Sequence, residues 1–371
     1  MNSLQNYSKN RIAGFDFARA VSAAGIFAVH FIQEAGMRTA VPDGVIIAAR
    51  EWGFIFVTVF FIMSGALLQM RHPFGSRNSA GDPDRPDSAR GEKGADGKHS
   101  LAAFYRKRAA SIYPMFYLVY IIVLAAWLAA GKETPAHLLR PEILFTAAGM
   151  DGYFASSFDT CYLVGEWFLG ALIILYILFP ALSYAAEKCE PLLWAALLVL
   201  YVCFMDRPLL SQAPVTNIFS CLICFAMGIS FGRHGLHSSK RIYILGLAVF
   251  IISLIPAFRN MAGMNISSHI TGAGLFILLL AAGGPVMNRR LPGRILGFTG
   301  DLSYPFYLVH HVITGAGLNY LFRHVAAAEQ SRKYLPAAAL LLFAVSLAAA
   351  WIMDRVLKIL KGRNRQKNGK A

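Results

Sequence analysis

The chain has 371 residues, of which 56% are hydrophobic and 15% charged, and its formal net charge at pH 7 is +15. Repeated apolar runs of ~20 residues, each long enough to cross a lipid bilayer, exclude an ordinary soluble protein. In a membrane protein, positive charge first indicates which loops face the cytoplasm, and we therefore expect no nucleic-acid partner.

These apolar runs predict an all-α, polytopic membrane protein with about ten transmembrane helices, because backbone within lipid must satisfy its own hydrogen bonds. Most of the 35 lysine and arginine residues fall on one side when both termini are placed in the cytoplasm. We therefore expect an N-in, C-in topology and a single membrane domain over residues 1–371. The predicted spans are Ile12–Ile32, Trp52–Met70, Ala109–Ala130, Trp167–Ala185, Leu192–Met205, Val215–Phe231, Ile242–Phe258, Ile266–Val286, Ile295–Leu321 and Leu335–Met353.

The first span carries an arginine and a histidine eleven residues apart, Arg19 and His30. At ~100° and ~1.5 Å per residue, eleven steps bring both side chains to one helix face, ~16 Å apart along the axis. Asp16 lies one turn before Arg19, within ~60° of the same face. Ionisable groups at membrane depth are costly and normally face a protein interior or a watery cavity, so this face predicts a functional site.

Three segments outside the spans differ in composition. His72–Ser100 is rich in Gly, Ser, Asp, Arg and Lys, with few large apolar residues, and we predict a disordered cytoplasmic loop. Residues 355–371 are a basic cytoplasmic tail, whose charges also attract membrane lipids. The longest outer loop, about Gly131 to Glu166, holds aromatic and acidic residues, including Asp151 and Tyr153. Such residues suit sugar binding and interfacial anchoring equally.

Five short motifs occur in order along the chain. They are the Arg19/His30 pair, Val59-Phe60-Phe61-Ile62-Met63-Ser64-Gly65, Phe104-Tyr105-Arg106-Lys107-Arg108 followed by Ile112-Tyr113-Pro114, Trp167-Phe168-Leu169, and Ser303-Tyr304-Pro305-Phe306-Tyr307-Leu308-Val309-His310. In this order they resemble the integral-membrane acyltransferase 3 family over about residues 11–355. The chain departs from that family at Ala66, where many members carry an aromatic residue, and at Leu172, where some branches carry a glutamate.

The resemblance implies an enzyme of the cell inner membrane that moves an acyl group from cytoplasmic acyl-CoA to a hydroxyl. The implied acceptor is a cell-surface glycan or its lipid-linked precursor. The implied acyl group is commonly acetyl, so acetyl-CoA is the expected co-substrate, and we expect no metal.

His30 is the predicted catalytic residue. Acyl transfer from a thioester to a hydroxyl needs a general base, and an imidazole with a pKa near ~6.5 suits that role at neutral pH. Its nitrogen could instead accept the acyl group and then pass it on. The alternative is a histidine that packs between helices through a hydrogen bond.

Three arginines are predicted to bind CoA. Arg19 would bind phosphate, because a guanidinium group matches phosphate oxygens and stays charged when desolvated. A structural pair between Arg19 and Asp16 is the alternative, and Asp16 could also orient Arg19. Arg106 and Arg108 lie at the cytoplasmic mouth of the third span, where the positive-inside rule predicts basic residues equally well.

Two supporting candidates come from spans two and four. Ser64 could donate a hydrogen bond in the cavity, or serve as a small residue that lets helices approach closely. Trp167 is a predicted acceptor-binding residue that could stack on a sugar, or it could belong to an aromatic belt at the membrane surface.

On the ninth span, Ser303, Tyr307 and His310 are spaced to share one helix face, whereas His311 is rotated ~100° away. We predict that Tyr307 and His310 bind the acceptor and that Ser303 supports them. An interfacial polar contact is the alternative role for His310.

Two other functional classes remain open. A secondary transporter or lipid-linked sugar flippase would use Asp16, Arg19 and His30 as a buried polar site. The sequence shows no paired interrupted helices in two similar halves, which are typical of transporters. A non-catalytic membrane scaffold would act through His72–Ser100.

Overall fold

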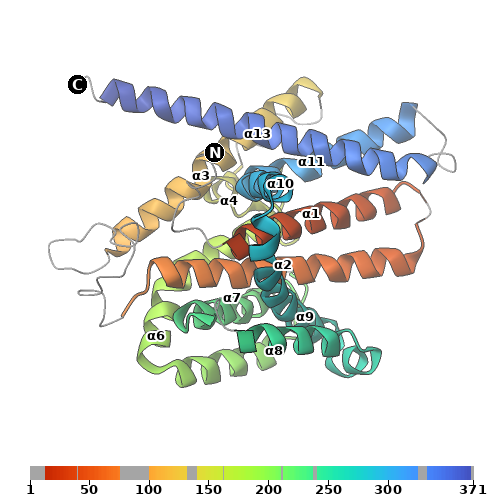
Figure 1. The fold of residues 1–371 in the computed structure, drawn as a ribbon. Coiled ribbons are helices and arrows are strands. Elements are labelled where there is room, and N and C mark those ends of the chain that lie inside the picture. The colour runs from red at the N-terminus through yellow and green to blue at the C-terminus, as the bar shows by residue number, and fades with distance from the viewer. Residues whose placement is uncertain are drawn as a thin grey trace. The chain divides into compact units, whose positions relative to one another are not determined.

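The computed structural model describes residues 13–39, 41–75, 100–131, 140–161, 163–209, 212–236, 240–324 and 332–368 (Figure 1). Within these ranges there are helices and no strands, which confirms the predicted all-α class. The helices are α1 (Ala13–Gly36), α2 (Asp43–Arg71), α3 (Leu101–Ala129), α4 (Ile143–Ala148), α5 (Asp151–Phe154), α6 (Trp167–Phe204), α7 (Ile218–Arg233), α8 (Lys240–Ser253), α9 (Pro256–Met287), α10 (Arg290–Asp301), α11 (Ser303–His324), the short 3-10 helix η5 (Arg332–Tyr334) and α13 (Leu335–Asn368).

Some sequence predictions fall outside these ranges. Most of the predicted loop His72–Ser100 lies outside the described residues, as does the end of the basic tail after Asn368.

The structure confirms the expected membrane character. Counting only the described residues, six helices are long and apolar enough to cross a membrane: α1, α2, α3, α6, α9 and the part Leu335–Gly362 of α13. The other predicted spans overlap helices, one in the second part of α6 and the others in α7, α8 and α11, but the predicted span Ile242–Phe258 runs past the end of α8 at Ser253 into the start of α9. The count of ten spans and the N-in, C-in orientation stay predictions.

The ninth predicted span, Ile295–Leu321, is wrong at its beginning. Two helices share that range, since α10 ends at Asp301 and α11 begins at Ser303. Pro305 explains the break, because a proline has no N–H to continue a helical ladder and is tolerated in the first turn of a new helix.

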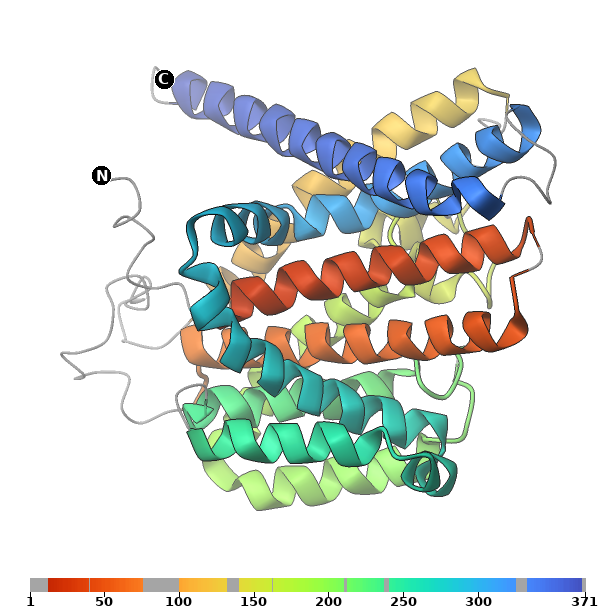
Figure 2. The ribbon, with the colours of Figure 1, turned by 45° about the vertical axis from the view of Figure 1, so that its right-hand side comes forward.

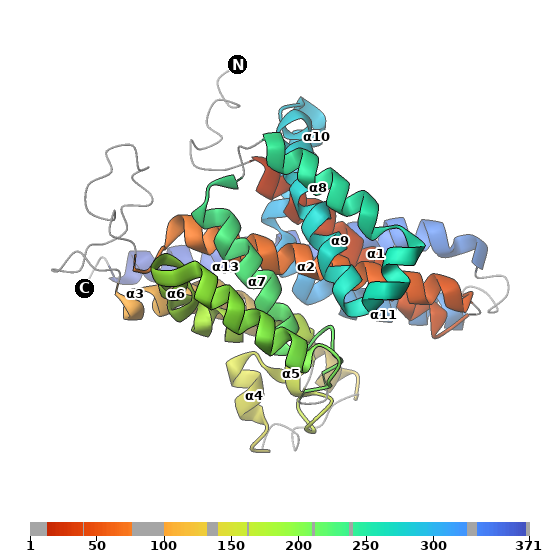
Figure 3. The same ribbon diagram turned by 90° about the horizontal axis from the view of Figure 1, so that it is seen from below.

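The chain divides into two compact units. The first holds the residues up to Ser22 together with Phe54–Ala109 and Ala171–Gly297, and the second holds Ala23–Gly53, Ala110–Gly170 and Phe298–Ala371. In the first unit, α8 and α9 lie side by side (Figures 1 and 3). In the second unit, α11 and α13 lie side by side (Figure 2).

In the first unit, α2 and α7 approach each other closely through two glycines. A Cβ atom on Gly65 would lie 2.1 Å from the Phe225 carbonyl oxygen, and one on Gly228 would lie 1.9 Å from the Ile62 carbonyl oxygen. No side chain fits at these distances. This contact favours helix packing as the role of the glycine in the Ser64-Gly65 motif.

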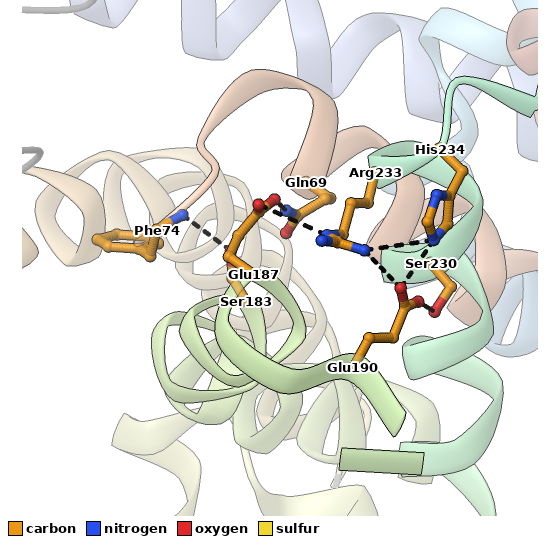
Figure 4. A network of polar contacts seen from close by, with 8 residues as sticks. All are labelled: Gln69, Phe74, Ser183, Glu187, Glu190, Ser230, Arg233 and His234. Carbon is orange, nitrogen blue, oxygen red and sulfur yellow. Dashed lines mark hydrogen bonds and ion pairs between the residues drawn. The ribbon is translucent and has the colours of Figure 1, made fainter. Parts of the chain in front are cut away.

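Helix α6 bends at Cys189, where the backbone leaves helical geometry. Arg233, at the end of α7, pairs with acidic residues on both sides of the bend (Figure 4): its Nε lies 3.5 Å from Glu187 Oε2 and its Nη1 lies 2.5 Å from Glu190 Oε2. Gln69 of α2 donates to Glu187 Oε1 at 2.9 Å. These contacts fix the turn between the fourth and fifth predicted spans to its neighbours in the first unit.

Candidate functional site

Three histidine rings meet in the second unit. The centre of the His30 ring, on α1, lies 5.3 Å from that of His310 and 5.1 Å from that of His311, both on α11. The structure therefore brings the predicted residues His30 and His310 together. The ~100° rotation between His310 and His311 along the helix does not keep His311 away from His30. His30 faces between the two neighbouring positions of α11, so both of their rings reach it.

His311 is held between two carboxylates from different elements. Its Nε2 lies 3.1 Å from Glu34 Oε1 on α1, and its Nδ1 lies 2.5 Å from Glu166 Oε1, which directly precedes α6. Both nitrogens therefore face carboxylate oxygens, and a ring in this setting is stabilised when both nitrogens carry a proton. Arg38 pairs with the other oxygen of the Glu34 carboxylate and also donates to the Glu34 carbonyl oxygen at 2.7 Å. Positive and negative groups thus alternate from Arg38 through Glu34 to His311, the ring that neighbours His30.

Glu166 is fixed through its backbone as well as its side chain. The Tyr307 hydroxyl donates to the Glu166 carbonyl oxygen at 3.1 Å, and the Tyr307 ring packs against Phe168. Gly152 pairs with Glu166 in an isolated parallel bridge. Tyr307, a predicted acceptor-binding residue, therefore contributes to the position of Glu166. Trp167, which follows Glu166, is partly exposed.

His310 is fully buried, and its ring stacks on Phe306 with an angle of 8° between the planes. Its Nδ1 lies 2.8 Å from the Tyr307 carbonyl oxygen and 3.2 Å from the Phe306 carbonyl oxygen. A carbonyl can only accept, so Nδ1 carries the proton. The other nitrogen, Nε2, is buried and has no hydrogen-bond partner among the described residues. Ser303 is buried at the start of the same helix.

Sequence reasoning missed Glu34, Glu166 and the contribution of His311. Glu34 could have been found, because it follows His30 by four residues and shares its helix face. Glu166 carries no comparable local signal, because its partner lies far away in the sequence.

The predicted phosphate-binding residues gather in the first unit. Arg19 Nη1 donates to Asp16 Oδ1 at 3.1 Å, so the predicted pair between them exists. Tyr176 of α6 exchanges a hydrogen bond with Ser64 and lies within electrostatic range of Arg19 and Arg108. Helix α1 is continuous from Ala13 to Gly36, so it carries both Arg19 and His30 with the expected helical spacing.

The two arginines at the start of α3 differ in their surroundings. Arg106 is exposed. The side chain of Arg108 is half-buried, its guanidinium carbon lies 5.9 Å from the centre of the Phe104 ring, and its Nε is buried with no hydrogen-bond partner in the described part of the chain. A buried guanidinium with an unused donor is the better anion ligand, so the geometry favours Arg108 over Arg106.

The segment between α3 and α6 is attached to α3 by three tyrosines. Their hydroxyls donate to backbone carbonyls of the segment: Tyr113 to Ala148 at 3.1 Å, Tyr117 to Ala147 at 2.5 Å and Tyr120 to Cys161 at 2.9 Å. These residues are spaced four and three apart along α3, so they share one face of the helix.

Two of the residues that suggested sugar binding, Asp151 and Tyr153, are buried in this segment, at 1% exposure each. Burial raises the pKa of the Asp151 carboxyl to about 6, and the hydrogen bond that Thr146 donates at 2.9 Å offsets part of this effect. The second carboxylate oxygen of Asp151 is buried and has no hydrogen-bond partner within the described ranges. These two side chains therefore belong to the interior of the segment.

We expect Asp151→Asn to remove a pH dependence of stability. The wild-type carboxyl loses its proton near pH ~4 when the chain is unfolded and near pH 6 when it is folded. The folded state therefore binds more protons in this window, and stability falls as the pH rises through it. From pH 4 to 7, the unfolding free energy of the variant relative to wild type should rise by up to about 3 kcal/mol. Melting temperatures in detergent across this range measure the change, and a constant difference would contradict it.

Comparison with known proteins adds to this geometry. A family described as "Acyltransferase domain" matches residues 12–355. The chain is also similar to a protein from Streptomyces mycarofaciens named acyltransferase MdmB, with 23% identity over 382 residues that cover 94% of this chain and 91% of that protein. No solved structure matches the chain. Within the described ranges, no group of three His, Cys, Asp or Glu side chains is arranged to hold a metal ion.

Proposed function

The chain belongs to the acyltransferase 3 family and is an acyltransferase, and we propose that it is an O-acyltransferase of the cell inner membrane. The donor is a cytoplasmic acyl-CoA, most simply acetyl-CoA, and the acceptor is a hydroxyl of a surface glycan or of a lipid-linked glycan precursor. The observation that carries this proposal is the histidine cluster of the second unit, in which His30 lies beside His310 and His311.

His30 is the proposed catalytic residue. As a general base it takes the proton of the acceptor hydroxyl while the hydroxyl oxygen attacks the acyl carbon, and the thiolate of CoA leaves. As a nucleophile it attacks the acyl carbon first, the thiolate of CoA leaves, and an acyl-imidazole forms; the acceptor hydroxyl then attacks this acyl group, and the departing imidazole takes up the hydroxyl proton. Either route needs one unprotonated ring nitrogen. The partial exposure of His30 supports access to a substrate.

Arg19 and Arg108 are the proposed ligands of the CoA phosphates. Both lie within electrostatic range of Tyr176. Arg19 and His30 are carried by one continuous helix, eleven residues apart in the sequence. Trp167 and Tyr307 stay candidates for the acceptor side, and His310, which is fully buried, is a candidate for a supporting role.

The function is tested by mass spectrometry of glycans. Surface glycans and lipid-linked glycans are compared between a strain lacking this protein and the same strain complemented with it. We expect one O-acyl group, with the mass of acetyl, to be missing from the glycans of the strain that lacks the protein and to be present again in the complemented strain. An unchanged glycan profile, together with sugar counterflow in liposomes without acyl-CoA, would favour a transporter instead.

Arg19→Ala should weaken acyl-CoA binding by about 10- to 100-fold, because a charge-assisted hydrogen bond to phosphate contributes roughly 1.5–3 kcal/mol. Equilibrium binding of radiolabelled acetyl-CoA to purified protein measures the change. Arg19→Lys keeps the charge but loses the forked geometry of the guanidinium group, so its affinity for acetyl-CoA should lie between those of wild type and Arg19→Ala.

Arg294→Ala is the matched control, because it removes an exposed arginine from the same unit. Its affinity for acetyl-CoA should equal that of wild type. Unchanged affinity in Arg19→Ala would reject the proposed role of Arg19.

A further inference from the structure

His30 has two histidine neighbours, and they differ in what they can offer it. His311 faces a carboxylate oxygen with each ring nitrogen, at 3.1 Å to Glu34 and at 2.5 Å to Glu166. Both of its nitrogens point at carboxylate oxygens, so neither nitrogen points its lone pair at His30. In His310, by contrast, only Nδ1 has a hydrogen-bond partner in the described part of the chain, and that partner is the protein backbone.

The backbone fixes which nitrogen of His310 is free. The carbonyl oxygens of Phe306 and Tyr307 require a proton on Nδ1, so Nε2 of the neutral ring holds a lone pair. Stacking against the Phe306 ring fixes the orientation of the His310 ring. A buried acceptor without a partner costs about 1–3 kcal/mol, so this orientation presents an unused acceptor to a neighbour that can donate.

We propose that His310 is a positioning residue for His30: Nε2 of His310 accepts a hydrogen bond from a ring N–H of His30. This bond would direct the remaining lone pair of His30 toward the acyl donor and acceptor. The inference rests on the proposed function, because it assigns a role relative to a catalytic His30.

The geometry suits such a bond. Two imidazole nitrogens that point at each other across ~3 Å place their ring centres ~5 Å apart, and the observed separation of the two ring centres is 5.3 Å. His310 Nε2 has no hydrogen-bond partner among the described residues, so the proposed bond requires the His30 ring to turn about its Cβ–Cγ bond until one nitrogen points at His310. Because His310 is fully buried, water does not compete there, and a hydrogen bond is stronger in such a dry environment.

The protonation state of His310 does not change during the proposed reaction. When His30 acts as base, its free nitrogen takes the proton of the acceptor hydroxyl, the new C–O bond forms and the C–S bond of the thioester breaks. The proton then passes from His30 to the departing thiolate. His310 keeps its own proton on Nδ1 throughout, and its lone pair stabilises the positive charge that His30 carries between these events.

Two amide variants separate this role from a purely structural one. Glutamine at position 310 places its amide near the site of Nε2, where its oxygen can accept from His30. Asparagine places its amide near the site of Nδ1, where it can still donate to the Tyr307 carbonyl. A positioning role through Nε2 predicts that His310→Gln is more active than His310→Asn, and a structural role through Nδ1 predicts the reverse order.

The assay uses the purified full-length protein, radiolabelled acetyl-CoA, and membranes of a strain lacking this protein as the source of acceptor. For His310→Asn we expect kcat to fall about 10²-fold or more, with KM for acetyl-CoA unchanged. For His310→Gln we expect a kcat within about 10-fold of wild type. The reverse order, equal losses in both variants, or wild-type activity in both would overturn the inference.

His269 provides the matched control. It is a buried histidine of α9 whose Nδ1 lies 3.0 Å from the Tyr201 hydroxyl, and it has no place in the proposed mechanism. Its Asn and Gln variants should keep wild-type kcat per folded molecule.

His30→Ala in the same assay distinguishes a failure of the proposed function from a failure of the inference about His310. Full activity of that variant would refute the proposed role of His30 itself. Loss of activity in His30→Ala, combined with wild-type activity in both His310 variants, would refute the present inference alone.

Discussion

Replacing His30 by alanine should lower kcat for acyl transfer by about 10²- to 10⁴-fold, the range that a positioned general base contributes. The imidazole is the proposed proton acceptor, and the two carboxylates nearby already face His311, so neither is free to replace it. Affinity for acetyl-CoA should change little, because the proposed phosphate ligands lie elsewhere on α1 and α3. Acylation by purified protein, with kcat and KM measured separately, tests the expectation.

The folded state of His30→Ala must be checked in parallel. His30 is partly exposed, so its truncation should leave the melting temperature in detergent near that of wild type. His269→Ala is the matched control, since it also removes a histidine from a helix interior. Acylation by His30→Ala at the wild-type rate would rule out the proposed mechanism.

Gly228→Leu should destabilise the protein by about 3 kcal/mol or more, because overpacking forces backbone to move where two helices touch. Even the first carbon of a side chain at this position would lie 1.9 Å from the Ile62 carbonyl oxygen. The leucine therefore separates α2 from α7 or prevents their contact. The apparent melting temperature and the yield of monodisperse protein in detergent measure the loss.

Gly44→Ala is the control for this prediction. Gly44 also lies in α2, but no atom lies within 4 Å of the place where its Cβ would be. Alanine favours a helix over glycine by up to ~1 kcal/mol, so this variant should be as stable as wild type or slightly more so. A wild-type melting temperature for Gly228→Leu would contradict the close contact of α2 with α7.

The sequence was sufficient to predict the features that depend on the geometry of a single helix. Apolar runs predict the helices, and spacing along α1 places Arg19 and His30 on one face. It also identifies His310 as a neighbour of Tyr307 on α11. Each of these inferences follows from helical geometry, which the local sequence controls.

The contacts between elements could not be predicted in this way. Rotation along α11 separates His310 from His311, but His30 approaches between them and meets both rings. Glu166 is far in sequence from His311, and the packing of the end of the α3–α6 segment against α11 brings their side chains together. Helix rotation alone carries no information about where a neighbouring helix lies.

The tyrosine contacts of α3 have a consequence for how relatives of this protein could diversify. Tyr113, Tyr117 and Tyr120 bind peptide carbonyls, a group that every amino acid supplies. Mutations that alter the residues at the three anchored positions therefore keep the same attachment points. The sequence of this segment could therefore change during evolution while its attachment to α3 is retained.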